Sequence, residues 1–357
     1  MSGVVRVGIV GTGWWAETMY LPSLESHQSA RITAICGRNS ERTAELAERA
    51  GGARAFADYH ELMVSGETDA VVVATPDDLH CAVTMAALEA GQHVICEKPM
   101  ANSLADAQAM LEKAESAGVR HMMMFSWRWQ PHWLYVKRLL EQGFIGRCHY
   151  ASLAFGGDGA LHPTYQWRMD GSRATGALGD LGSHMFDFTR WLLGEVQGVG
   201  ARLTQGVDRS AFGGEPTYDN AAVSLVVDGG ILVQVHVSMG VTYGDSVVRL
   251  RTEFHGDQGT LEAQHDFLGT TAGVKIRGCR RGEKFHDLAT PPDLLAGTDR
   301  ADIFSPYRLH SAGPRHFVDS IIVGKPPSPS FRDGVKAQEV IDAAARSSAE
   351  NRWVDLS

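Results

Sequence analysis

Residues 176–187, GALGDLGSHMFD, place two carboxylates and an imidazole at helical spacing. On a helix, Asp180, His184 and Asp187 fall at i, i+4 and i+7, so all three lie on one face. A histidine flanked by carboxylates is held in one tautomer and becomes a better general base. The same spacing also fits an ordinary helix start. It could chelate a metal as well, but the chain has no H-x-x-E-H or C-x-x-C companion, so we expect no metal.

A second reactive group follows a predicted strand. Residues 92–100 read QHVICEKPM, in which an apolar run finishes in Glu97 and Lys98 and is followed by Pro99. A lysine at the end of a strand is usually just solvated. Proline restricts the backbone, and an X-Pro bond can be cis, so Pro99 could hold the turn that carries Lys98.

A glycine-rich turn near the N-terminus has the form of a dinucleotide-binding loop. Residues 7–16 read VGIVGTGWWA, which gives G-x-G-x-x-A directly after the first predicted strand. Gly11 permits the tight turn, and Gly13 lets the backbone approach a pyrophosphate at the start of a helix. We expect Gly11, Thr12, Gly13, Trp14 and Trp15 to contact the cofactor; the alternative is a purely structural turn.

The end of the second predicted strand bears on the choice of cofactor. A protein that prefers NAD usually places an acid there for the ribose 2′-hydroxyl, whereas this chain has Arg38, Asn39 and Ser40. Arg38 can pair with a 2′-phosphate, and its two neighbours can add hydrogen bonds. We therefore expect NADP as the preferred cofactor. NAD is the alternative, since an arginine stacked on adenine would suit an enzyme that uses either.

The elements that must position these groups change in character along the chain. Up to about residue 126, short apolar runs alternate with helical stretches, which predicts a parallel sheet covered on both faces. Beyond it, longer alternating segments at 147–155, 221–227, 231–238, 247–255 and 260–265 predict a mostly antiparallel sheet with one partly open face. We expect an α/β protein with a Rossmann dinucleotide-binding domain at 1–126. A substrate-binding and oligomerisation domain should follow at 127–357.

Composition narrows the class of protein. The chain has 357 residues and a net charge of −9, which gives no basic footprint for nucleic acid or an anionic membrane. Its five cysteines are scattered and odd in number, which favours reduced thiols. No apolar run is long enough to cross a bilayer. We expect a cytoplasmic protein with no nucleic-acid or membrane partner.

Together, these motifs resemble the glucose-fructose oxidoreductase / inositol dehydrogenase (Gfo/Idh/MocA) family. The resemblance is carried, in order, by GTGWWA at 11–16, TPDDLH at 75–80, EKP at 97–99 and GDLGSHMFD at 179–187. Weaker similarities are SWRWQP at 126–131, GFIGR at 143–147 and FHGDQGTLEA at 254–263. The resemblance covers nearly the whole chain and implies a catalytic site between a Rossmann domain and a C-terminal α/β domain.

The resemblance also implies roles for individual residues. Lys98, Asp180 and His184 take the family's catalytic positions, with His184 as general base and the other two orienting the substrate hydroxyl and relaying its proton. Which of Lys98 and His184 takes the proton first stays open. The family's cofactor-flanking positions fall on Thr75, Pro76, His80 and Glu97, and Arg128 is expected to border cofactor and substrate.

Two stretches depart from the family or extend beyond its motifs. Tyr20 stands where the family often has a histidine, and bulky Trp14 could narrow the substrate pocket instead of contacting the cofactor. Before the catalytic helix lie groups that suit a sugar ring, by stacking and hydrogen bonding. They are His162, Tyr165, Trp167 and Arg168, of which we expect Tyr165, Trp167 and Arg168 to contact substrate.

The resulting expectation is an NAD(P)-dependent dehydrogenase or reductase acting on a sugar, cyclitol or related polyol. One alternative is a redox-neutral glycoside hydrolase or lyase that oxidises its substrate transiently. Another is a non-catalytic dinucleotide sensor, which would have little reason to keep Lys98, Asp180 and His184 together. We also expect a homo-oligomer, a dimer or tetramer, formed through the exposed face of the second sheet.

Overall fold

The computed structural model describes residues 3–213, 215–267, 269, 272–299 and 302–356. Two compact units are present: Met1–Ser126 with Phe304–Val335, and Trp127–Ile303 with Lys336–Ser357. The sequence predicted one domain boundary, after residue 126. In the structure the chain also returns to the first unit over Phe304–Val335. This return arises because α9 (Ser305–Leu309) and α10 (Pro314–Val323) pack against α1 (Leu21–Glu25).

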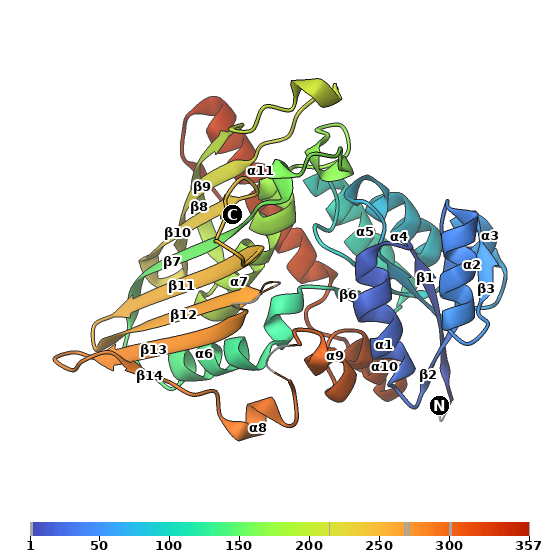
Figure 1. Cartoon of the computed structure of the whole chain (residues 1–357), viewed down its shortest axis with the longest axis horizontal. Helices are drawn as coiled ribbons and strands as arrows, with labels where there is room; N and C mark the ends of the chain where they lie inside the picture. Colours follow the sequence, from blue (N-terminus) through green and yellow to red (C-terminus); the bar gives the residue numbers. More distant parts are fainter. Residues whose placement is uncertain (1–2, 214, 268, 270–271, 300–301, 357) are drawn as a thin grey trace. The chain divides into compact units, whose positions relative to one another are not determined.

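Within the described residues, the first unit holds a parallel sheet with the strand order β3-β2-β1-β4-β5-β6 (Figure 1). Its strands are β1 (Val5–Val10), β2 (Ala30–Cys36), β3 (Arg54–Phe56), β4 (Ala70–Val73), β5 (His93–Cys96) and β6 (His121–Met123). This is the strand order of a doubly wound dinucleotide-binding fold, so the expected Rossmann domain is confirmed. In such sheets the ligand crevice lies outside the carboxyl ends of the strands, at the point where the order reverses, here between β1 and β4.

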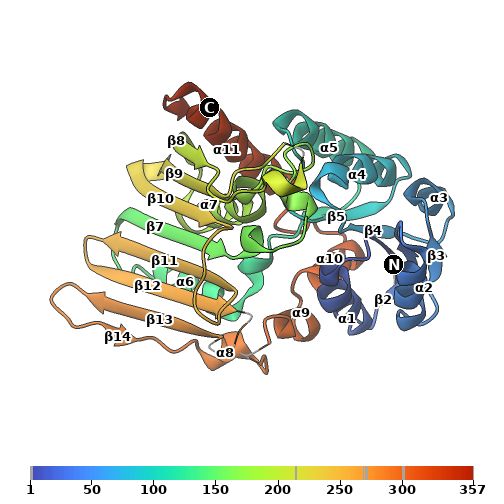
Figure 2. The same cartoon turned by 45° about the horizontal axis from the view of Figure 1, so that its top comes forward.

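Helices cover both faces of this sheet, which is why its central strands are apolar throughout. All four residues of β4 are buried. Figure 2 shows the sheet between α4 and α5 on one side and α1 and α10 on the other. The helices that follow the strands are the π-helix η1 (Ala16–Tyr20), α2 (Ser40–Arg49), α3 (Tyr59–Val64), the 3₁₀ turn η2 (Asp77–Leu79), α4 (His80–Glu89) and α5 (Leu104–Ala117).

The second unit contains one large sheet, ordered β14-β13-β12-β11-β7-β10-β9-β8-β15 in the part of the chain that the structure describes. Its strands are β7 (Cys148–Gly157), β8 (Val196–Thr204), β9 (Asn220–Val227), β10 (Ile231–Ser238), β11 (Val248–Gly256), β12 (Gly259–Phe267), β13 (Gly273–Arg280), β14 (His286–Asp287) and β15 (Val354–Asp355). β7 and β10 pair in parallel, and the other neighbours pair antiparallel. The expected mostly antiparallel sheet is confirmed.

One face of this sheet is covered by α6 (Pro131–Glu141), α7 (Ser183–Leu193) and the later part of α11 (Phe331–Glu350). These helices and alternate residues of the strands form one apolar core. On the opposite face the strand residues are more exposed; Leu232 and His236 of β10 are examples. Short turns η3 (Ser126–Trp129) and η5 (Trp167–Met169) and the π-helix η6 (Leu178–Gly182) lead into α6 and α7.

Some elements differ from the sequence expectations. β8 has no strong strand pattern because glycines are unfavourable in strands, yet here Trp353 packs where the side chains of Gly198 and Gly200 would stand. The helix after β2 is capped by Asn39, whose Oδ1 accepts a hydrogen bond from the Arg42 N–H at 3.0 Å. Ser40 is the first helical residue.

Candidate active site

The glycine loop after β1 has the geometry that a pyrophosphate requires. Gly11 adopts φ = +115°, and a Cβ there would stand 2.2 Å from the carbonyl oxygen of Ala74, so no other residue fits. A Cβ on Gly13, by contrast, would meet no described atom within 4 Å. The backbone at Gly13 is therefore open to a ligand, at the start of a helical segment with unpaired N–H groups. The loop fits a dinucleotide phosphate.

Aromatic rings flank the same loop. The Trp14 ring lies 5.8 Å from that of Trp15, and both rings lie within 5.7 Å of Phe304, between centroids. Trp14 stays half exposed despite these contacts. Phe304 was not anticipated, because it is distant in sequence and joins the first unit only through the chain's return. The three rings form an apolar platform next to the phosphate loop.

The polar side chains after β2 differ in whether they already have partners within the protein. Asn39 uses its carbonyl oxygen as a helix cap. Arg42 and Arg49 both pair with Glu17. Arg38 is exposed, and no carboxylate among the described residues pairs with it. Arg38 is thus the cation at this edge that can meet a ligand.

The loops after β4 and β5 are joined by His80. Its Nδ1 lies 2.7 Å from the carbonyl oxygen of Pro99, and its Nε2 lies 3.0 Å from that of Thr75. Burial lowers the pKa of His80 to about 4, a shift that the two carbonyl oxygens oppose. The Lys98–Pro99 peptide is cis. His80 therefore connects the turn that carries Lys98 to the loop that carries Thr75.

Thr75 also offers an unused group. Its Oγ1 is buried and has no hydrogen-bond partner among the described atoms. A buried hydroxyl without a partner is unfavourable unless something else satisfies it. This orphaned hydroxyl follows β4, at the carboxyl edge where the sheet's order reverses, so it suits a bound cofactor as partner.

Glu97 is held on both carboxylate oxygens. Tyr20 donates its hydroxyl to Oε1 at 2.8 Å, and the Lys98 backbone N–H donates to Oε2 at 3.3 Å. Burial raises the pKa of the Glu97 carboxyl, an effect that the nearby Lys98 ammonium and the Tyr20 hydroxyl oppose. Sequence reasoning noted Tyr20 only as a departure from the family. The structure gives it a role: it orients the acid that precedes Lys98.

In the second unit, Arg128 is paired with Asp187 instead of being presented to solvent. Its Nε donates to Oδ2 at 2.8 Å and its Nη2 donates to Oδ1 at 2.5 Å. The side chains are only 9% and 2% exposed. Asp187 lies one turn beyond His184 on α7, so this bidentate pair fixes the helix that carries the predicted base. Sequence spacing had placed Asp187 on the face of His184 without indicating this partner.

His184 lies in the first turn of α7 and is 8% exposed. Its ring centroid is 6.1 Å from Trp127 and 6.0 Å from Phe155. Asp180 precedes it in the π-helix η6, where it pairs with Arg168 across 3.4 Å from Nε to Oδ1. π-helical turns are rare and occur frequently at functional sites.

The residues predicted to contact substrate divide into two groups. The Arg168 guanidinium lies 4.2 Å over the Trp167 ring while it pairs with Asp180, so these three side chains are together. Tyr165 belongs elsewhere: its hydroxyl donates to Asp170 Oδ2 at 2.8 Å. His162 is exposed and contacts Thr164.

No cluster of three or more His, Cys, Asp or Glu side chains suited to a metal ion occurs in the described parts of the chain. None of the helices within those parts is long and apolar enough to cross a membrane.

Comparison with known proteins gives the family. Residues 5–125 match an oxidoreductase family with an NAD-binding Rossmann fold, and residues 137–356 match that family's C-terminal alpha/beta domain. Myo-inositol 2-dehydrogenase of Thermotoga maritima is 29% identical over 354 residues, covering 99% of this chain and 98% of that protein. A scyllo-inositol 2-dehydrogenase (NADP(+)) of Bacillus subtilis is 26% identical over 364 residues, with 99% and 96% covered.

A solved structure agrees with these relatives. Levoglucosan dehydrogenase in complex with NADH and levoglucosan matches with a TM-score of 0.88 and 25% identity, over 98% of this chain and 99% of that one. Profile matches to both domains span far more than half of the chain. The protein therefore belongs to the Gfo/Idh/MocA oxidoreductase family and is a nicotinamide-dependent oxidoreductase, as the sequence predicted.

Proposed function

We propose that this enzyme transfers a hydride between a nicotinamide cofactor and a hydroxyl-bearing carbon of a sugar, cyclitol or related polyol. The observation that carries the proposal is the placement of Lys98. It follows β5 at the carboxyl edge of a Rossmann sheet, next to buried Glu97, in a turn connected to Thr75 through His80. Relatives named for inositols and a solved neighbour in complex with levoglucosan support the substrate class.

Each predicted catalytic residue has a part in this reaction. The Lys98 ammonium donates a hydrogen bond to the substrate oxygen and stabilises negative charge that develops on it. His184 accepts the hydroxyl proton as general base, and Asp180 orients that hydroxyl. The loop of Gly11 and Gly13 and the Thr75 hydroxyl would hold a nicotinamide dinucleotide, which would supply the hydride acceptor for the carbon that bears this hydroxyl. Tyr20 and Arg128 are positioning residues, since they act through Glu97 and Asp187.

We infer that the first unit binds the cofactor and the second binds the substrate. In the first unit, Gly11, Gly13 and the Thr75 hydroxyl have the geometry for a dinucleotide. In the second, Asp180 lies with Arg168 and Trp167, which combine a charged hydrogen-bonding group with a ring face. Thr12, Trp14, Trp15, Pro76 and Glu97 complete the proposed cofactor contacts.

Lys98→Ala tests the mechanism. We expect kcat to fall at least about 100-fold, because Lys98 acts on charge in the transition state, while binding of the dinucleotide is retained. Lys113→Ala, which removes a lysine from α5 of the same unit, is the control. The assay is a nicotinamide absorbance screen over aldoses, inositols, anhydrosugars and sugar acids, with products checked by mass. Full turnover by Lys98→Ala with intact cofactor binding would show that the mechanism is wrong.

We propose NADP as the preferred cofactor. Arg38 is exposed after β2, where no acid stands to meet a ribose 2′-hydroxyl. A charge-assisted contact to a 2′-phosphate contributes about 1.5–3 kcal/mol, so Arg38→Asp should weaken NADP binding roughly 10- to 100-fold and leave NAD binding close to its original value. Equal changes for both cofactors would contradict the assignment.

A cytoplasmic homo-oligomer, either a dimer or a tetramer, stays a prediction. The second sheet has a more exposed face on which side chains such as Leu232 are accessible. Light scattering at working concentration gives the mass in solution, and a monomeric mass would count against assembly.

A further inference from the structure

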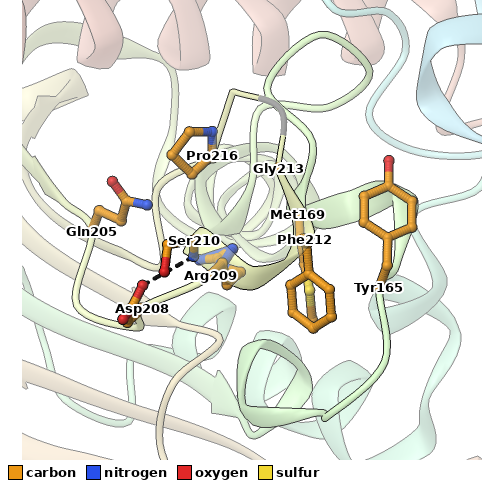
Figure 3. A pocket seen from close by; sticks show the side chains of 9 residues that line it. All are labelled: Tyr165, Met169, Gln205, Asp208, Arg209, Ser210, Phe212, Gly213 and Pro216. Carbon is orange, nitrogen blue, oxygen red and sulfur yellow. Dashed lines mark hydrogen bonds between the residues drawn. The ribbon is translucent and has the colours of Figure 1, made fainter.

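A cavity of about 200 Å³ lies in the second unit, within the loops that precede η6 and connect β8 to β9 (Figure 3). Figure 3 shows Tyr165 on one side of it, Gln205 and Asp208 on the other, and Phe212 between them. This volume holds several water molecules, which a single six-membered ring with its hydroxyl groups would displace.

The apolar part of the lining is aromatic and accessible. Tyr165 is 46% exposed and Phe212 is 37% exposed, and their ring centroids lie 6.4 Å apart at an interplanar angle of 63°. Met169 also lines the cavity and is buried. The Tyr165 ring is held in place because its hydroxyl donates to Asp170. These rings offer flat faces to the C–H groups of a ligand.

The charged part of the lining is internally balanced. Arg209 is almost fully buried and forms an ion pair with Asp219. The other oxygen of Asp219 accepts the backbone N–H groups of Gly206 and Val207 at 2.8 and 2.7 Å. Because Asp219 already neutralises Arg209, this guanidinium is not a site for a second anion.

A further acid in the lining disfavours anionic ligands directly. The Ser210 N–H donates to Asp208 Oδ1 at 2.9 Å, and this bond lowers the pKa of the Asp208 carboxyl, which is therefore ionised near neutral pH. The lining thus combines ring faces with a carboxylate, which suits a neutral polyhydroxylated molecule.

The cavity is lined by a backbone segment that also carries Arg168, the partner of the predicted catalytic residue Asp180. Met169 lines the cavity, while its neighbour Arg168 pairs with Asp180. Thr217 fastens this segment to the β8–β9 loop: its hydroxyl donates to the Arg168 carbonyl at 3.2 Å, and its N–H donates to the Met169 carbonyl at 3.2 Å. Occupation of the cavity would therefore act on the segment that positions Arg168.

We propose that this cavity binds one neutral sugar ring, in addition to the ring that carries the reacting hydroxyl. The bound ring is either the second unit of a disaccharide substrate or a separate monosaccharide. The existence of a second, reacting ring elsewhere rests on the proposed function. The binding of a sugar in this cavity does not depend on it.

The test measures binding of glucose, galactose, cellobiose and maltose to the full chain by calorimetry. Phe212→Ala removes a stacking face and should weaken binding of at least one of these sugars about tenfold. Ser210→Trp, which fills the cavity from an exposed position, should weaken binding of the same sugar. The matched control is Phe285→Ala, since Phe285 is 38% exposed in the same unit but lies outside the cavity.

The outcomes separate the two sources of the ring. If Phe212→Ala lowers the ratio of kcat/KM for a disaccharide to that for its monosaccharide, the ring is the second unit of the substrate. If the ratio stays constant while calorimetry shows the loss of affinity, the ring is a separate molecule. Absence of binding by the wild-type protein, or equal affinities in Phe212→Ala and Phe285→Ala, would overturn the proposal. Binding without turnover of any sugar would instead contradict the proposed function alone.

Discussion

The buried pair between Arg128 and Asp187 leads to a prediction about both stability and catalysis. Replacing Asp187 with alanine leaves the Arg128 guanidinium buried, at 9% side-chain exposure, without the two hydrogen bonds of 2.8 and 2.5 Å. Breaking a buried ion pair by removing one of its partners destabilises a protein by about 3–5 kcal/mol. For a unit of this size, that loss lowers the melting temperature by about 10 °C.

Two matched variants isolate the cause. Asp293→Ala breaks an ion pair with Arg138 in the same unit, where the side chains are 36% and 63% exposed, so it should cost less than about 1 kcal/mol. The double variant Arg128→Met/Asp187→Leu removes both charges together. It should lie close to the wild type in stability, because apolar side chains then replace both buried charges.

Calorimetry and urea unfolding followed by circular dichroism measure these differences, and kcat reports on catalysis. Since α7 carries His184, we expect Asp187→Ala to lower kcat even at temperatures where the protein stays folded. A loss of stability no greater than that of Asp293→Ala would refute the reasoning. A double variant as unstable as Asp187→Ala would refute it as well, since the defect would then not come from burying Arg128 without Asp187.

Two further predictions concern the phosphate loop and the response to acid. Gly13→Ala should leave the melting temperature unchanged, because its Cβ meets no described atom within 4 Å, yet weaken dinucleotide binding at least about tenfold; Gly11→Ala should destabilise the fold, since its Cβ would overlap the Ala74 carbonyl. Thermal melting and cofactor titration check both, and unaltered affinity in Gly13→Ala would contradict the loop's assignment. Burial lowers the pKa of His265 from 6.5 to about 4, so the unfolded state binds a proton more readily than the folded state does. The free energy of unfolding should therefore fall as the pH falls from 6.5 towards 4. The total loss should be about 3 kcal/mol. Urea unfolding between pH 7 and 4 should show this loss in the wild type and a smaller one in His265→Phe; equal slopes would exclude His265 as the cause.

Much of the fold could be predicted because its signals are local. Apolar runs such as Ala70–Val73 indicate buried strands through their own composition, and G-x-G-x-x-A indicates a turn that only glycine can make. Strands whose stability comes from distant partners were missed. β8 is glycine-rich and depends on Trp353, which covers Gly198 and Gly200 from the far end of the chain.

The candidate site divides in the same way. By itself, the sequence determined which chemical groups are present and on which elements they lie, because strand, loop and helix signals depend on neighbouring residues: Lys98 after a strand, Asp180 and His184 at a helix start. Only the tertiary structure decided which side chains position the residues next to these groups. Tyr20 reaches Glu97 across 77 positions, and Arg128 reaches Asp187 across 59. Such partners are distant in sequence, so they depend on the path of the whole chain. Charged contacts become strong, and unpaired charges costly, only after folding has excluded water from around them.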